Sequence, residues 1–401
     1  MSTASRPFSL TAIAVLIVIS GLAPLATATY LPAMPLAQAE LLASPVAMQL
    51  TLTTFILGTA LGQLVTGPIS DRTGRKSALL AGLALYLIST VAVALSPTIT
   101  WLIWWRVAQG AGAGAGMVLA RAVVADRVHG TAAAKLMSLM MAVGVVAPAV
   151  APLFGVMVLQ LGSWRWIFGS VVVISLLVVL AVVFWLPETR QRGVGRTAGP
   201  GGREGRTWGP FLALTAANAF AFAAMYSLIS GGPYLYQAQF GFSAESYAAL
   251  NGVISLGMAA VTFFGTRAFG RSTRFGVLTP KRVALLSLSA LLAGGLIVAA
   301  VHTLDAPVPV WLIALALVTL PVGLASGSLM ALAMDASPLA PGSASAIIGV
   351  VQAVFGAAMP PLIGLGGEAP SGVIAVSLVV ASGLALGMYL VGAAAPRERS
   401  R

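Results

Sequence analysis

The 401-residue sequence contains no cysteine, only two histidines and few charged residues. Without cysteine the chain has no disulfide and no thiol for redox chemistry or metal binding. Because His129 and His302 lie far apart in the sequence, we also expect no histidine metal site. Charged residues make up 8% of the chain, against about 25% in soluble domains, and 59% of its residues are hydrophobic. So few charges cannot cover a globular core, so lipid must be the main solvent of this chain.

Apolar stretches long enough to cross a bilayer recur along the whole chain, whose mean hydropathy is +0.98. A hydrocarbon layer about 30 Å thick requires roughly 20 apolar residues in a helix. The alternating pattern of barrel strands, about ten residues each, is not present. We therefore predict an all-α membrane protein with twelve transmembrane helices, at about residues 9–31, 46–70, 77–96, 99–125, 136–160, 166–186, 209–232, 246–267, 283–301, 308–332, 342–365 and 371–394.

One polar segment, at residues 187–208, divides these stretches into two groups of six. It is rich in glycine and arginine, and it is too short to contain a soluble domain such as an ATPase. We expect an N-terminal lobe at 1–186, a cytoplasmic linker at 187–208 and a C-terminal lobe at 209–401. This is the layout of transporters whose two halves rock about a central cavity.

The basic residues are distributed unevenly between the two sides of the membrane. With the N-terminus inside, all but three of the 22 Lys and Arg residues lie in cytoplasmic segments. Arg165 lies outside, and Arg106 and Arg121 lie within the fourth helix. This strong positive-inside bias predicts that both termini are cytoplasmic. The formal charge of +12 therefore reflects orientation and an attraction to anionic lipid, and we expect no nucleic-acid partner.

The run Gly110–Gly116 alternates glycine and alanine within the fourth helix. It follows no strand, and its spacing differs from that of a dinucleotide-binding loop, so we expect no nucleotide cofactor here. Small residues in a membrane helix allow neighbouring helices to approach closely. We predict that these glycines pack helices together.

The connection after the second helix reads Gly67-Pro68-Ile69-Ser70-Asp71-Arg72-Thr73-Gly74-Arg75-Lys76. A solvated turn that obeys the positive-inside rule would also explain its charges. The full ten-residue pattern, however, resembles the loop motif of the major facilitator superfamily. That resemblance implies the fold of this superfamily, with two six-helix lobes.

The same resemblance implies roles for the charged residues of this motif. Asp71 would cap the N-terminus of the eleventh helix, near Gly342 and Ser343, where the helix dipole favours an anion. Arg72 or Arg75 would meet an acid at the end of the fourth helix, and Asp126 is well placed for it. The contact would be a latch that holds the outward-facing state.

The fourth helix carries Arg106, Gln109 and Gly110 in a pattern similar to the second motif of this superfamily. Because Arg106 lies near the outer end of its helix, its side chain could instead extend to the membrane surface. The motif implies a buried arginine that lines the cavity and takes part in substrate binding or proton coupling. Arg121 is five residues from Asp126, a spacing that gives no ideal ion pair within a helix. We expect Arg121 to be a gating or packing residue.

The fifth helix carries Gly144, Pro148, Pro152 and Gly155. The two prolines remove backbone donors and are expected to bend the helix, while the glycines let a neighbour approach. Bent helices are common in membranes, but this pattern resembles the motif associated with antiporters in the superfamily.

Two further segments, Tyr30-Leu31-Pro32 and Leu186-Pro187-Glu188-Thr189, complete a resemblance to the Bcr/CflA branch of drug:proton antiporters over residues 24–360. The branch includes bicyclomycin and phenicol exporters. The resemblance implies efflux of a small drug by alternating access, with protons as the second partner. It also implies a monomer in a bacterial cytoplasmic (inner) membrane.

The sequence departs from this branch at Ala28, where members usually have an acid. All ten Asp and Glu residues lie at helix ends or in loops, whereas proton coupling requires a titratable group in the cavity. Asp126 is the nearest candidate, although the latch is its better-supported role. Uniport, or coupling through a peripheral acid, therefore remains an alternative.

A cavity poor in acids suits a neutral or weakly acidic amphiphile, such as a phenicol-like drug. A native metabolite, such as a sugar or nucleoside carried without proton coupling, is the alternative substrate. We expect no enzymatic activity, because no span carries a nucleophile and base at membrane depth, and we expect no cofactor. The candidate substrate-binding residues are Tyr30, Arg106, Gln109, Asn218, Tyr226, Asn251 and Gln352.

Overall fold

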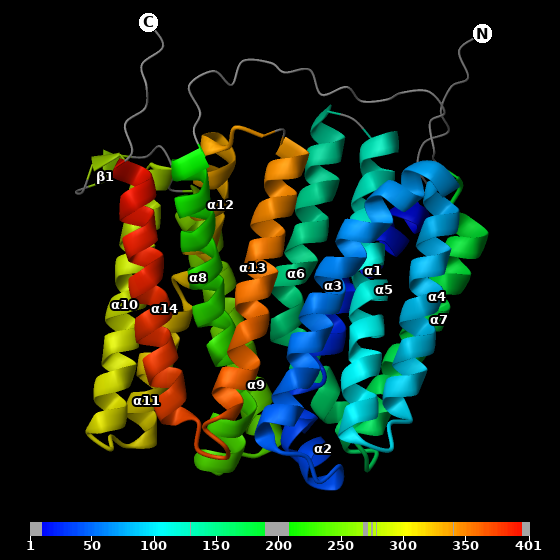
Figure 1. Cartoon of the computed structure of the whole chain (residues 1–401). Coiled ribbons are helices and arrows are strands. Elements are labelled where there is room, and N and C mark those ends of the chain that lie inside the picture. The colour runs from blue at the N-terminus through cyan, green and yellow to red at the C-terminus, as the bar shows by residue number, and fades with distance from the viewer. Residues whose placement is uncertain are drawn as a thin grey trace, which may run out of the picture. The chain divides into compact units, whose positions relative to one another are not determined.

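The computed structural model describes residues 10–128, 130–188, 208–267, 272–273, 276–277, 279–339 and 341–394. Nearly all of them are helical (Figure 1). The elements are α1 (Leu10–Ala28), the 3-10 helix η1 (Leu31–Ala33), α2 (Met34–Glu40), α3 (Pro45–Thr73), α4 (Arg75–Ala94), α5 (Ile99–Arg127), α6 (Gly130–Leu159), α7 (Arg165–Trp185), α8 (Trp208–Pro233), the π-helix η2 (Tyr234–Gln239), α9 (Ala244–Arg267), β1 (Ser272–Thr273), β2 (Gly276–Val277), α10 (Pro280–Thr303), α11 (Val308–Thr319), α12 (Val322–Ala336), α13 (Pro341–Gly364) and α14 (Ser371–Ala394).

The helices agree closely with the predicted spans. Within the described residues, eleven helices are long and apolar enough to cross a membrane, and Val146–Leu159 of α6 is a further, shorter apolar helix. The all-helical membrane architecture is therefore confirmed. The predicted span at 308–332 forms two helices, α11 and α12, which are separated at Leu320 and Pro321. Proline has no N–H to donate and its ring clashes with the preceding turn, which accounts for the break.

Two local features were not predicted. The span of α8 continues as the π-helix η2, so this helical segment reaches Gln239. Between α9 and α10, β1 and β2 pair as a short antiparallel ladder. Both features depend on local hydrogen-bonding patterns that hydropathy does not report.

By its internal contacts the chain divides into two units. Unit 1 contains residues 1–33 and 54–195, and unit 2 contains residues 34–53 and 196–401. The predicted linker at 187–208 lies almost entirely outside the described residues, so the predicted lobe boundaries stay a prediction. Helix α3 begins in unit 2 and continues into unit 1. Its first turns are held in unit 2 by Gln49, which donates to the carbonyl of Ser230 (2.8 Å), and by Thr53, which donates to the carbonyl of Ala357 (2.7 Å).

In unit 1, α5 packs directly against α3 and α4 through its glycines. A Cβ atom at Gly110 or Gly114 would meet a backbone carbonyl of α3, and one at Gly112 would meet the backbone of α4 at Tyr86. In return, Gly58 and Gly62 of α3 lie against the backbone of α5. The prediction that this glycine run packs helices is therefore confirmed. Backbones can approach this closely only where neither helix presents a side chain.

In unit 2, α8 packs against α12, α13 and α14. A Cβ atom at Gly356 of α13 would meet the rings of Phe222 and Tyr226 on α8, and one at Gly231 of α8 would meet Ile363 of α13. Later residues of α8 thus meet later residues of α13, so the two helices run parallel. Figure 1 shows α10 and α14 side by side at the edge of the same unit.

Candidate functional site

Arg106 on α5 is completely buried, with 0% of its surface exposed. Its Nη1 donates to Oε1 of Gln109, one turn later, over 2.7 Å. Nε2 of Gln109 donates to Oγ1 of Thr90 on α4 (2.9 Å), and Thr90 donates to the carbonyl of Tyr86 (2.6 Å). A chain of hydrogen bonds therefore fixes the guanidinium through α4. The hydrogen bond from Nη1 lowers the cost of burying this charge at membrane depth.

Aromatic rings surround the same guanidinium. Its Cζ lies 4.1 Å from the ring centroid of Phe55, 5.6 Å from that of Tyr30 and 5.9 Å from that of Phe168. The rings of Tyr30 and Phe168 also pack on each other, with centroids 5.1 Å apart. These are cation–π distances, and they are worth more where water is excluded. The side chain is buried among these rings, as the motif implied, and does not extend to the membrane surface.

The structure thus brings Tyr30, Arg106 and Gln109 together in unit 1. Thr90 and Phe168 belong to this cluster but were not among the predicted site residues. Phe168 ends the segment Gly162–Phe168, which also resembles the branch, but only the packing of α4 and α7 reveals that Thr90 and Phe168 belong to this site. Ala28 is the last residue of α1 and is buried, with 5% exposed, so the position where an acid was expected holds a buried methyl group.

A second group of predicted residues meets between α8 and α13 in unit 2. Gly356 lies against Phe222 and Tyr226, whose ring centroids are 4.8 Å apart. Gln352 precedes Gly356 by one turn, and Asn218 precedes Phe222 by one turn. Because the two helices run parallel, Asn218 and Gln352 lie at the same level. No described contact brings Asn251 into this group, and the main contacts of its helix, α9, are with α11, α12 and η2.

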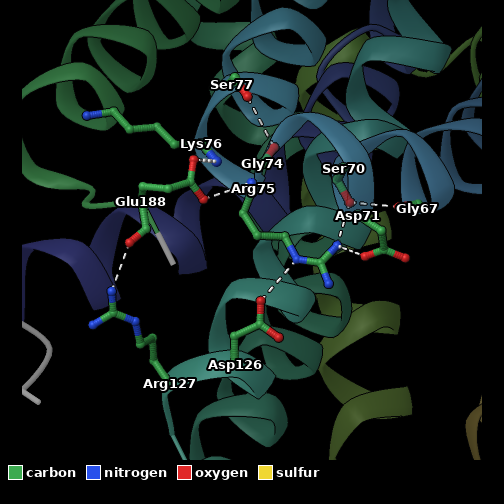
Figure 2. A network of polar contacts seen from close by, with 10 residues as sticks. All are labelled: Gly67, Ser70, Asp71, Gly74, Arg75, Lys76, Ser77, Asp126, Arg127 and Glu188. Atoms are coloured by element: carbon green, nitrogen blue, oxygen red, sulfur yellow. Dashed lines mark hydrogen bonds and ion pairs between the residues drawn. The ribbon is translucent and has the colours of Figure 1, made fainter. Parts of the chain in front are cut away.

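The charged motif after α3 forms a network around Arg75 (Figure 2). Its Nη1 lies 2.6 Å from Oδ1 of Asp71 and also donates to Oγ of Ser70, while its Nε donates to Oδ2 of Asp126 on α5 (3.0 Å). The predicted loop is a single residue, because α3 runs to Thr73 and α4 begins at Arg75. Gly74 makes this turn with φ of +100°, a conformation that L side chains rarely adopt.

Glu188, which follows α7, completes this network (Figure 2). Its two carboxylate oxygens accept from the backbone N–H groups of Arg75 (2.9 Å) and Lys76 (3.2 Å). The free N–H groups and the dipole of α4 both favour an anion there. Arg127 donates to the backbone carbonyl of Glu188 (2.8 Å). The resemblance of the segment Leu186-Pro187-Glu188-Thr189 did not predict that Glu188 accepts from the first N–H groups of α4.

Of the predicted gating contacts, the one between Arg75 and Asp126 is present, and its role as a latch stays a prediction. The side chain of Asp71 pairs with Arg75 and is 64% exposed. Its predicted capping of the helix that contains Gly342 would join the two units, so it stays a prediction. Arg72 and Arg121 have exposed side chains.

Helix α6 runs without interruption from Gly130 to Leu159 and contains Pro148 and Pro152. A Cβ atom at Gly155 would meet the carbonyl of Thr29, just after α1, so this glycine permits the close approach that was predicted. The bend at the two prolines, and the role of Gly144, stay predictions. Among the described residues, no group of three or more His, Cys, Asp or Glu side chains could hold a metal ion.

The sequence model of the Major Facilitator Superfamily matches residues 16–360 of this chain. The chain belongs to the Major Facilitator Superfamily. It is therefore a multi-pass membrane transporter, in agreement with its helices, and the superfamily predicted from the loop motif is confirmed.

Individual relatives agree with this assignment. The chain is 31% identical over 352 residues to an uncharacterized MFS-type transporter, YdgK, of Bacillus subtilis, and the match covers 86% of both chains. It is 26% identical over 327 residues to the multidrug resistance protein MdtL of Citrobacter koseri, with 80% of both covered. A bacterial homologue of the human lysosomal transporter Spinster has the same fold, with a TM-score of 0.73 over 97% of both chains and 17% identity.

Proposed function

We propose that this transporter exports a small, hydrophobic, neutral drug of the phenicol or bicyclomycin kind by alternating access, in exchange for protons. We also propose that it belongs to the Bcr/CflA branch of its superfamily. Tyr30, Arg106 and Gln109 of unit 1, with Asn218, Tyr226 and Gln352 of unit 2, are the proposed substrate-binding residues. Asn251 is proposed on its sequence position alone.

The observation that carries the proposal is the charge of the buried site. Among the described residues, Arg106 is the only charged side chain that is buried. A fixed positive charge in a medium of low dielectric repels an organic cation strongly, and no carboxylate of the sequence lies in the middle of a span to attract one. Rings and amide groups remain to bind a neutral amphiphile. The name of the MdtL relative, a multidrug resistance protein, supports a drug as the substrate.

Asp126 is the candidate acid for proton exchange. The position of the usual acid is occupied by Ala28, and Asp126 is engaged by Arg75 over 3.0 Å. Coupling through Asp126 would require this ion pair to open during the transport cycle, which would link protonation to the movement of the latch. If the pair never exchanges protons, the carrier is a uniporter.

Transport by acidified inverted vesicles tests the function. Chloramphenicol added to vesicles that contain the protein is expected to accumulate and to release protons, and vesicles without the protein are the control. Accumulation without proton release would establish a drug uniporter. If no phenicol or bicyclomycin accumulates, the drug proposal is wrong, and a native metabolite becomes the substrate to test.

We also propose a bacterial inner-membrane location with both termini in the cytoplasm. Because the chain has no cysteine, single cysteines report orientation without background. A membrane-impermeant maleimide should label Ser163→Cys, between α6 and α7, in intact cells. Gly201→Cys, in the segment that joins α7 and α8, should be labelled only after the membrane is opened. The reverse pattern would contradict the orientation.

A further inference from the structure

Three polar side chains on α8, those of Thr215, Asn218 and Ser230, are buried with one atom that has no hydrogen-bond partner among the described residues. The first two lie close together along the helix. Thr215 is 2% exposed and Asn218 is 1% exposed. Neither Oγ1 of Thr215 nor Oδ1 of Asn218 has a partner in the part of the chain that the structure describes. A buried polar atom without a partner destabilises the fold, so such atoms are uncommon in native proteins.

The hydroxyl of Thr215 differs from those of Ser227 and Ser382, and it resembles those of Ser230 on α8 and Ser328 on α12, which also have no partner among the described residues. Serine and threonine in a helix usually donate to a carbonyl one turn earlier. Ser227, on the same helix, donates to the carbonyl of Ala223 (3.1 Å), and Ser382 on α14 donates to that of Leu378 (2.6 Å). Thr215 lies within α8 and has such a carbonyl available, at Phe211. Its hydroxyl makes no hydrogen bond to this carbonyl, so it can bond to a group outside its own helix.

The two side chains adjoin the aromatic end of the site between α8 and α13. Thr215 and Asn218 are three residues apart, so they share one face of α8, and Phe222 follows Asn218 by one turn on that face. Phe222 and Tyr226 are half-buried and pack on Gly356 of α13. The face therefore presents two buried hydrogen-bonding groups and, about 5 Å further along the helix, a pair of rings.

We propose that Thr215 and Asn218 bind a hydroxyl group of the substrate and select neutral aromatic molecules that carry a hydroxyl near the ring. This rests on the proposed function and names the substrate class of the site. Oδ1 of Asn218 can only accept a hydrogen bond. A carboxylate has no proton to offer it, and a molecule without a hydroxyl near the ring leaves it unsatisfied. The rings of Phe222 and Tyr226 receive the aromatic part of the substrate.

Binding to the purified, full-length protein in nanodiscs tests the proposal with a matched pair of ligands. Chloramphenicol carries two hydroxyl groups near its ring. Its 1,3-diacetyl ester has lost both but keeps the amide N–H, so the pair isolates the effect of the hydroxyls. Thr215→Val and Asn218→Leu remove the polar atoms with little change in volume. Ser227→Ala is the control, because it removes a buried hydroxyl of α8 that is already bonded to the helix.

The wild-type protein should bind chloramphenicol about tenfold more tightly than the diester, the order expected for a hydrogen bond to a buried group. Thr215→Val and Asn218→Leu should each weaken the binding of chloramphenicol by about three- to tenfold and reduce its preference over the diester. Ser227→Ala should leave both affinities unchanged. Export of chloramphenicol that is unchanged in Thr215→Val and Asn218→Leu would overturn the proposed site while the proposed function stands.

The melting temperature without ligand provides a second measurement. If the two groups await a substrate, Thr215→Val removes an unsatisfied hydroxyl, so the ligand-free melting temperature should stay the same or rise. A fall in this temperature, with chloramphenicol binding intact, would mean that the pair holds a structural water, and it would overturn the proposal. If the wild-type protein neither binds nor exports chloramphenicol, the proposed function fails for phenicols. The ligand-free melting temperature then decides the site by itself.

Discussion

The Nε atom of Arg75, at the start of α4, lies 3.0 Å from Oδ2 of Asp126, near the end of α5. The side chains are only 19% and 21% exposed, so this ion pair is better shielded from water than most surface pairs. It joins the consecutive helices α4 and α5 through two residues that are 51 positions apart in the chain. Asp71, which is bound to the same guanidinium, is far more exposed, so Asp126 is the partner that depends most on Arg75.

Asp126→Asn should therefore lower the rate of export severalfold while the protein still folds. The amide keeps the shape of the carboxylate but removes the charge that holds Arg75, and a shielded pair loses about 1–3 kcal/mol in this way. Drug accumulation in vesicles measures the rate. The charge-swapped double variant Arg75→Asp with Asp126→Arg should recover part of the activity lost by either single variant. No recovery would mean that the two residues act separately.

The cap that Glu188 places on α4 should contribute measurable stability. Glu188→Ala leaves two backbone N–H groups of α4 without their partner and should cost about 1 kcal/mol, the usual value for a lost N-cap. Glu188→Gln keeps acceptors for one of these groups and should cost less. The melting temperature of the purified protein measures both. Equal losses in the two variants would show that the charge, and not the hydrogen bonds, stabilises this end.

Gly74→Ala should be more harmful than its small size suggests. A side chain at φ of +100° strains the backbone, and the new Cβ would lie 2.9 Å from Oε2 of Glu188. Together these should cost about 1–3 kcal/mol. Combining Gly74→Ala with Glu188→Ala removes the clash but not the strain. The double variant should therefore lose less stability than the sum of the two single variants.

The glycines of α5 should tolerate no side chain where they face α3. Gly114→Ala places a Cβ against the carbonyl of Thr59, so the helices must separate, and the melting temperature should fall by several degrees. Gly387→Ala on α14 is the control, because a Cβ atom there meets nothing within 4 Å. The control should be neutral or slightly stabilising, since alanine favours a helix more than glycine does. Similar melting temperatures for the two variants would contradict the close packing.

The sequence allowed the helices and one gating contact to be predicted because both rest on strong signals. Span length follows from bilayer thickness, and the partner of Arg75 follows from a ten-residue motif. The hydrogen bond from the N–H of Arg75 to Glu188 joins residues 113 positions apart. That Asn218 and Gln352 lie at the same level depends on the register of α8 against α13. Hydropathy fixes neither of these relationships. The break at Pro321 was visible in the sequence, but a proline in a membrane helix can also be accommodated without a break.

Ala28 offers the most direct test of coupling. It is buried at the end of α1, two residues before Tyr30, whose ring lies 5.6 Å from the guanidinium of Arg106. Ala28→Glu would place a titratable group in this part of unit 1, where release of its proton is favoured by the nearby positive charge. If the wild-type carrier is uncoupled, Ala28→Glu should gain drug-dependent proton release from acidified inverted vesicles, and Ala28→Gln, of the same size, should not. If the wild-type protein already releases protons and Asp126→Asn abolishes this release, coupling runs through the latch. The methyl group at position 28 would then be compatible with antiport.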